Sequence, residues 1–279
     1  MAEEKAGSGF YADIVDGDVY KYFAHGEWKS SSSGRSVNII NPCTRTVVYR
    51  VQGCTQDEVD GVFESATIAQ KRWAKTPLWK RAELLHKAAH ILREHKEPIV
   101  DCLVTEVAKA RKDSITEVLR SADFVSYCAE EGVRLLAEGK FLVGDSFPGN
   151  DRTKLCMASK VPLGVVLCIP PFNTPSTLLS PRSPRPDRWQ CRRAQAPHSG
   201  RGGRAAHGAV LPGGGVPKGL ISAVTGKGSD IGTSSPCTPL STASASQAAT
   251  RALPSAAGGH DSTTDELGGK DACIVLGGR

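Results

Sequence analysis

L-G-V-V-L-C-I-P-P-F-N, from Leu163 to Asn173, is the stretch that decides the fold class. Val165 and Ile169 are β-branched and their neighbours are apolar, which favours a buried β-strand. The two prolines that follow cannot donate hydrogen bonds to a ladder, so we expect the strand to end before them. Asn173 then lies beyond the carboxyl end of a strand, where open α/β sheets bind their ligands. Its side-chain amide suits an oxyanion, although asparagine is also common in turns.

Helical periodicity fills the region before this strand, from residue 55 to 138. Thr55 and Glu58 fit a capping box at the start of a first helix. Thr76 and the proline after it predict a second start, with Thr76 as the N-cap and the proline at the first helical position. The sequence therefore predicts capped amphipathic helices upstream of the strand.

Further elements complete the α/β pattern. Two more helices are expected near 98–108 and 114–137, and residues 139–169 alternate strands with turns. Residues 1–53 read as short strands and turns, which we interpret as a small β layer laid against a larger body. Helices followed by a buried strand predict an α/β fold with a cofactor domain assembled from residue 55 onward.

Composition excludes several classes of protein. The 279 residues carry a net charge of +6 with 23% charged residues, which is ordinary for a soluble domain. The nine cysteines include no C-x-x-C pair, so we expect reduced thiols and no metal site. No apolar run reaches membrane-spanning length and the N-terminus has no signal-peptide core. We therefore expect a cytoplasmic protein with no membrane contact.

Two longer motifs make the chain recognisable. P-L-W-K-R-A-E-L-L-H-K-A-A at 77–89 and G-D-S-F-P-G-N-D-R-T-K at 144–154, together with the strand, resemble the aldehyde dehydrogenase superfamily. The likeness is greatest to its plant members that oxidise glyceraldehyde 3-phosphate to 3-phosphoglycerate with NADP and add no phosphate. The resemblance implies an aldehyde dehydrogenase-like α/β fold with a Rossmann-type cofactor domain, NADP as cofactor, a small aldehyde substrate and a homo-oligomer.

The resemblance is interrupted, which suggests a division into six segments. It runs from about residue 9 to 173, returns over 217–232 and returns again at 266–276. We expect an N-terminal β segment of the oligomerisation type at 1–53, the helices and first strands of the cofactor domain at 54–173, disordered or frameshifted residues at 174–216 and 233–265, a cofactor-domain remnant at 217–232, and the truncated start of a catalytic-domain motif at 266–279.

Three residues take reaction roles if the resemblance holds. Arg120 corresponds to a contact with the substrate phosphate, which suits the bidentate fork of a guanidinium, although a solvated helix residue is the alternative. Asn173 corresponds to the oxyanion-stabilising and substrate-contacting asparagine. Glu266, in E-L-G-G-K, corresponds to the general base that activates water to hydrolyse a thioester.

The cofactor residues are implied in the same way. Gly226, Gly228 and Gly232 form G-K-G-S-D-I-G after an apolar run, a spacing that lets backbone amides approach a dinucleotide. Glycine clusters are also common in ordinary turns, so the motif by itself is weak. Leu267 and Gly268 correspond to positions near the nicotinamide.

The nucleophile of the family is a cysteine thiolate, and none of the nine cysteines fits that role. By resemblance it belongs some tens of residues beyond Glu266. Cys273 follows the glutamate too closely, and both Cys273 and Cys168 sit in apolar strands, so we interpret them as core residues. We expect little or no activity from these 279 residues.

Residues 174–216 and 233–265 show no periodicity and are rich in Pro, Arg, Ser, Gly and Ala. One interpretation is a disordered basic arm that binds nucleic acid or another partner, since 181–204 holds seven arginines and one acidic residue. That range has a single aromatic residue for stacking, which makes nucleic acid a poor match.

The other interpretation of residues 174–216 and 233–265 is translation out of frame. Asp187 to Pro197 can be read one nucleotide later as I-A-G-N-A-V-V-L-K-P-P, and Ser246 to Leu253 one nucleotide earlier as F-P-G-G-D-T-G-I.

Overall fold

The computed structural model of the chain describes residues 13–143, 155–160, 164–169, 192–195, 215–231, 243–246 and 263–265. The strands are β1 (Val15–Asp16), β2 (Val19–Tyr20), β3 (Tyr22–Ala24), β4 (Glu27–Lys29), β5 (Ser36–Ile40), β6 (Val47–Gln52), β7 (Lys140–Val143), β8 (Leu155–Ala158), β9 (Val166–Ile169), β10 (Arg192–Gln195), β11 (Ile221–Val224), β12 (Ala243–Ser246) and β13 (Thr263–Asp265). The helices are α1 (Gln56–Ala74), α2 (Leu78–Glu94), α3 (Lys96–Val107), α4 (Arg111–Leu136) and α6 (Gly228–Ile231).

A parallel sheet forms the centre of the described structure, in the order β13–β12–β9–β10–β11. Counted by position along the chain from the β11 edge, this order is 3-2-1-4-5, as in doubly wound nucleotide-binding folds. Its first strand, β9, is the strand predicted from Leu163 to Asn173. The α/β fold class with a Rossmann-type sheet is therefore confirmed.

The N-terminal strands correct the expectation that residues 1–53 form a layer of their own. β3 pairs antiparallel with β11, with Phe23 opposite Ala223, and β4 continues the same sheet. The reason is burial: every residue of β3 is buried, and buried backbone needs ladder partners, which the edge of β11 provides. The strands β1, β2, β6 and β5 do form a separate sheet, in which the rings of Tyr20 and Tyr49 lie 4.5 Å apart.

Helix α1 packs on the parallel sheet and begins where the sequence predicted. The capping box is present, because the Thr55 hydroxyl accepts from the Glu58 N–H and the Glu58 carboxylate accepts from the Thr55 N–H. Phe63 and Trp73 of α1 are buried in one core with Val224 of β11. Burial of this apolar face, more than the cap, holds the helix against the sheet.

The start of α2 corrects a second prediction. The helix begins at Leu78 with Pro77 as its N-cap, and no side chain caps it. Thr76 is not the cap, because its hydroxyl donates to the carbonyl of Arg72 at the end of α1. The carbonyl of Pro77 accepts from the N–H of Arg81 at 3.1 Å, so the hydrogen bonding of α2 begins at the proline.

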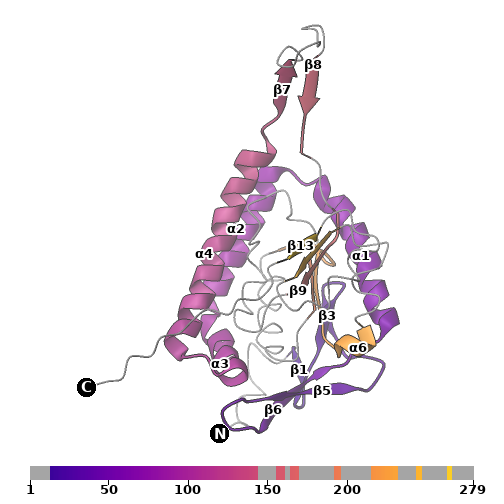
Figure 1. Ribbon diagram of the computed structural model, residues 1–279, viewed down its shortest axis with the longest axis vertical. Helices are drawn as coiled ribbons and strands as arrows, with labels where there is room; N and C mark the ends of the chain where they lie inside the picture. Colours follow the sequence, from indigo (N-terminus) through magenta and orange to yellow (C-terminus); the bar gives the residue numbers. More distant parts are fainter. Residues whose placement is uncertain are drawn as a thin grey trace, which may run out of the picture.

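Helices α2, α3 and α4 form a bundle beside the sheet, with α2 and α4 side by side along their lengths (Figure 1). Leu92, Leu103 and Val118 are buried within it, one from each helix. The two helices predicted near 98–108 and 114–137 are thus confirmed, and each begins slightly earlier than the pattern indicated.

The hairpin β7–β8 projects beyond the end of α4 (Figure 1). All its strand residues are exposed, including Phe141 at 69%, Leu155 at 68% and Met157 at 70%. These are apolar side chains on both strands. The hairpin therefore presents an apolar surface that nothing in the described part of the chain covers.

Short strands also lie within 174–216 and 233–265, which were predicted to be disordered or frameshifted. β10 lies in the first segment, and β12 and β13 lie in the second. Each of these short strands pairs in parallel with a neighbour in the sheet. Their sequences, R-R-A-Q, A-S-A-S and T-T-D, nevertheless lack any large apolar residue.

Candidate functional site

The glycine motif lies at the carboxyl end of β11, between that strand and α6. Gly226 is buried, and a Cβ atom there would lie 2.8 Å from Cδ1 of Ile231. Ile231 is itself fully buried, so its side chain cannot move aside easily. Gly226 therefore permits close packing of α6 on the end of the strand, and Gly228 is the first residue of α6.

Two hydrogen bonds fix this turn to the end of β6. The hydroxyl of Thr225 donates to the carbonyl of Gln52 at 2.5 Å, and the N–H of Cys54 donates to the carbonyl of Thr225 at 2.9 Å. All three residues are buried. The backbone before Gly226 is therefore held in place by a segment nearly two hundred residues earlier in the chain.

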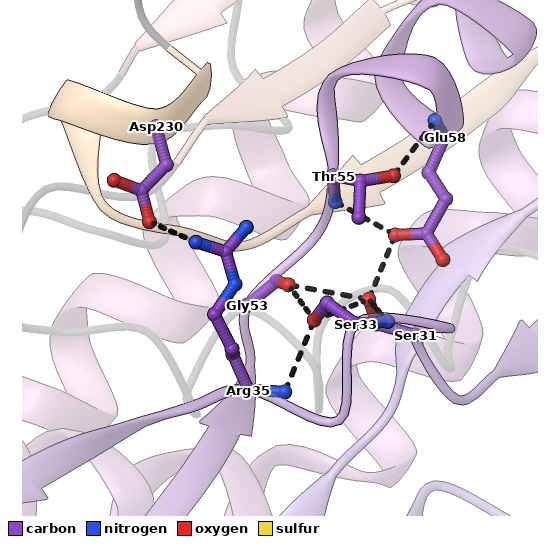
Figure 2. A network of polar contacts seen from close by, with 7 residues as sticks. All are labelled: Ser31, Ser33, Arg35, Gly53, Thr55, Glu58 and Asp230. Atoms are coloured by element: carbon purple, nitrogen blue, oxygen red, sulfur yellow. Dashed lines mark hydrogen bonds and ion pairs between the residues drawn. The ribbon is translucent and has the colours of Figure 1, made fainter.

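An ion pair connects α6 to the loop before β5. Arg35 Nη1 lies 3.1 Å from Asp230 Oδ2, as Figure 2 shows. Both side chains are partly exposed, at 58% and 32%. A pair of that kind stabilises a fold by only about 0.2–1 kcal/mol, so it orients α6 without anchoring it.

A more extensive polar network lies next to this pair, at the start of α1 (Figure 2). Glu58 Oε2 accepts from the Ser31 hydroxyl and the Thr55 N–H, each at 2.8 Å. Its Oε1 accepts from the N–H of Ser32 at 2.8 Å and from the hydroxyl of Ser32 at 3.0 Å. The carboxylate thus joins the 31–35 loop to the first turn of α1.

The same contacts set the acidity of Glu58. Partial burial raises its pKa, but the N–H groups of Ser32 and Thr55 and the hydroxyls of Ser31 and Ser32 together outweigh burial, so the net pKa of Glu58 is lowered. The Ser31 and Ser33 hydroxyls also donate to the carbonyl of Gly53, at 3.2 and 2.7 Å. Glu58 is therefore charged at neutral pH and supports the segment that carries the Thr225 contacts.

The sequence predicted only part of this network. The capping-box motif identified Thr55 and Glu58, which are close together in the sequence. The link from Ser31 to Glu58 spans 27 positions and the link from Arg35 to Asp230 spans 195, so neither has a sequence signal. The run S-S-S-G-R at 31–35 reads as an ordinary polar loop.

Arg120 lies exposed on α4. Within the described residues no hydrogen bond or ion pair involves it, so its guanidinium is open to a ligand. Helices α4 and α6 lie on opposite sides of the view in Figure 1.

The other predicted site residues lie outside the described residues: Asn173, Gly232, Glu266, Leu267 and Gly268. Their roles remain predictions. The backbone of β9 ends four positions before Asn173, at Ile169, on the strand next to the chain reversal of the sheet order. Doubly wound sheets bind ligands at that reversal.

The described residues also bear on metal binding and on membrane insertion. Among the described residues no cluster of His, Cys, Asp or Glu side chains could hold a metal ion. None of the helices in those ranges is both long and apolar enough to cross a membrane.

Comparisons with known sequences agree with the fold. A family model described as the aldehyde dehydrogenase family matches residues 28–186. The chain is 57% identical to the NADP-dependent glyceraldehyde-3-phosphate dehydrogenase of Apium graveolens and 56% identical to that of Arabidopsis thaliana, each over 275 residues and 97% of this chain. It covers 55% of each relative, and so spans about half the length of these curated enzymes.

Solved structures also match the fold of this chain. The NADP-dependent glyceraldehyde-3-phosphate dehydrogenase from Bacillus halodurans C-125, complexed with NADP, superposes with a TM-score of 0.80 at 31% identity, over 90% of this chain and 53% of that one. Lactaldehyde dehydrogenase from Escherichia coli superposes with a TM-score of 0.81 over 90% of this chain and 52% of that one. Its identity is 23%, so this second likeness concerns the fold alone.

Proposed function

This chain belongs to the aldehyde dehydrogenase family, and on that premise we propose that it is part of an NADP-dependent enzyme that oxidises glyceraldehyde 3-phosphate to 3-phosphoglycerate without adding phosphate. The observation that supports this substrate and cofactor is 52–57% identity, along 97% of the chain, to plant enzymes named for that aldehyde and for NADP. The glycine motif also follows the carboxyl end of β11, the end of a parallel strand at which doubly wound sheets bind ligands.

Each residue has a defined task in this proposal. NADP, held at the glycine motif after β11, would supply the hydride acceptor for this oxidation. The Asn173 amide donates to the carbonyl oxygen, which becomes an oxyanion when a thiolate attacks it. Glu266 takes a proton from water, and that water then releases the acid from the thioester. Arg120 binds the phosphate, and Gly226, Gly228, Gly232, Leu267 and Gly268 line the cofactor.

We further propose that the 279 residues alone have little or no activity. This proposal rests on the absence of a cysteine at the position that the family resemblance requires; of the described cysteines, Cys54, Cys102 and Cys128 are buried, and Cys43 and Cys156 are exposed. Turnover of glyceraldehyde 3-phosphate by the purified chain, followed as NADPH absorbance, would refute this.

A chimera tests the substrate assignment. Residues 13–143 of this chain would replace the matching segment of the Apium graveolens enzyme, which 57% identity favours. In that chimera we expect Arg120→Ala to raise KM for glyceraldehyde 3-phosphate by roughly 10- to 150-fold, since a charged hydrogen-bonded contact is worth about 1.5–3 kcal/mol. KM for unphosphorylated glyceraldehyde should not change.

Arg134→Ala is the control for that experiment. Arg134 is also exposed on α4, but its guanidinium already pairs with Glu131 on the same helix. It should leave both KM values within twofold. Equal losses with the phosphorylated and unphosphorylated aldehydes would rule out Arg120 as the phosphate contact.

Homo-oligomerisation belongs to the same proposal, and the hairpin β7–β8 supports it. Phe141, Leu155 and Met157 expose apolar side chains on a projecting two-stranded sheet, and apolar patches of this kind mark interaction sites. We expect Phe141→Lys to shift the chain toward monomer in light scattering. Lys140→Glu on the same strand is the control and should leave the mass unchanged.

We also propose a cytoplasmic location and two frameshifted segments, as the composition indicated. The rival proposal is a basic arm that binds nucleic acid, and it rests on the seven arginines of 181–204. Salt-dependent binding of RNA by the purified chain would favour the rival.

A further inference from the structure

β10 and β12 occupy the two places on either side of β9. β10 pairs in parallel with both β9 and β11, and β12 pairs in parallel with both β9 and β13. Neither strand is at an edge. Interior strands of a parallel sheet are covered on both faces, so their sequences are normally continuous apolar runs.

The sequences at these two places do not meet that requirement. β10 reads Arg192-Arg193-Ala194-Gln195 and β12 reads Ala243-Ser244-Ala245-Ser246. Because side chains in a strand alternate between faces, no register of an R-R-A-Q strand keeps arginine off both faces. The neighbouring strands β9 and β11, V-L-C-I and I-S-A-V, show the expected composition.

Codon arithmetic shows what other frames encode at β12. Serine codons of the TCN type, read one nucleotide earlier, become NTC, which encodes Phe, Leu, Ile or Val whatever the added base. Alanine codons become NGC, which encodes Ser, Cys, Arg or Gly. If both serines of β12 have TCN codons, positions 244 and 246 therefore become large apolar residues, which A-S-A-S lacks.

At β10 a shift in the opposite direction, one nucleotide later, also introduces apolar residues. Read one nucleotide later, its four codons allow Val-Val-Leu followed by Lys or Arg, and that last position is basic for every glutamine codon. Read one nucleotide earlier, the same codons allow no Val, Leu, Ile or Phe at any of the four positions. The apolar reading thus falls on the residues that the sheet places between β9 and β11.

We propose that residues 174–216 and 233–265 are read from shifted frames of their message, and that the polypeptide which builds this sheet carries aliphatic or aromatic side chains at β10 and β12. The argument uses strand pairing and codons, so it stands apart from the proposed reaction. An enzyme with another substrate would still need these two strands to be apolar.

Mass spectrometry of the protein isolated from its native cells tests this. Trypsin acting on the sequence as it stands releases Ala194–Arg201, A-Q-A-P-H-S-G-R. Asp113–Arg120, D-S-I-T-E-V-L-R, lies before the first shift and serves as the internal reference. Labelled copies of both peptides, and of the shifted peptide that contains V-V-L-K-P-P, allow quantification.

We expect the shifted peptide in amounts equal to the reference, and Ala194–Arg201 at less than one-hundredth of it. The reverse ratio would overturn the proposal. The message over codons 165–279 then separates two sources: a changed nucleotide count places the shift in the gene, and an unchanged count places it at the ribosome. Loss of dehydrogenase activity in a variant would affect the proposed function and not this ratio.

Discussion

Glu58→Gln is the most informative single change, because one carboxylate accepts all the contacts between the 31–35 loop and the first turn of α1. An amide in its place keeps one acceptor oxygen and turns an N–H₂ group toward two donors. At about 1–1.5 kcal/mol for each lost hydrogen bond, discounted for partial exposure, we expect a loss of about 2–3 kcal/mol in the free energy of unfolding.

The lowered pKa of Glu58 makes the effect of this substitution depend on pH, which provides a second measurement. The pKa of Glu58 is lowered in the folded chain, so its contribution to stability is complete above the unfolded value of about 4.3 and is lost as pH falls through the folded pKa. Glutamine does not titrate. The difference in unfolding free energy between the native chain and Glu58→Gln should therefore be largest near pH 6–7 and shrink toward pH 3.

Urea denaturation of the full chain at several pH values measures both quantities. Glu64→Gln is the matched control, since Glu64 is exposed on the same helix and should change stability by less than about 0.5 kcal/mol. A Glu58→Gln loss no larger than that of the control would refute the reasoning. So would a loss of the same size at pH 3 and pH 7, since it would be independent of the charge.

Two further pairs of variants test the packing around the glycine motif and the sheet. Gly226→Ala should lower the free energy of unfolding by about 1–3 kcal/mol and weaken NADP binding in titration calorimetry, because its Cβ would meet Ile231 at 2.8 Å. Gly61→Ala, in α1 with nothing within 4 Å, should instead stabilise by about 0.5–1 kcal/mol; equal effects of the two would contradict the packing argument. Trp73→Ala should cost about 3–5 kcal/mol in urea denaturation because the side chain is 2% exposed, whereas Trp79→Ala, at 64%, should have little effect.

The features that were predicted correctly are those that depend on residues close together in the sequence. β9, the helices and the Thr55–Glu58 cap all follow from periodicity or from residues three or four apart. Thr76 failed as a cap because the end of α1 competes for its hydroxyl, and a single-sequence pattern does not contain that competitor. The side chains that hold α6 in place were missed because Arg35 and Asp230 meet only after folding.

The order of strands in the sheet is the other feature that the local sequence pattern could not predict. Nothing in Tyr22–Ala24 marks it as a partner of β11 rather than of its own neighbours. The glycine motif shows the opposite limit: the sequence drew attention to Gly226 as a cofactor residue, whereas the structure gives it a packing reason, its contact with Ile231. Asn173 and Glu266 stay predictions from resemblance.

The pairing of Phe23 with Ala223 also has a consequence for biosynthesis. The α2–α3–α4 bundle is built from contacts close in sequence and can form while the ribosome is still at work. The β3–β4 hairpin cannot complete its ladder until two hundred more residues have been made. During that interval a strand that is buried in the folded chain exposes an unpaired edge to solvent, which makes the nascent chain a client for chaperones and a target for proteases.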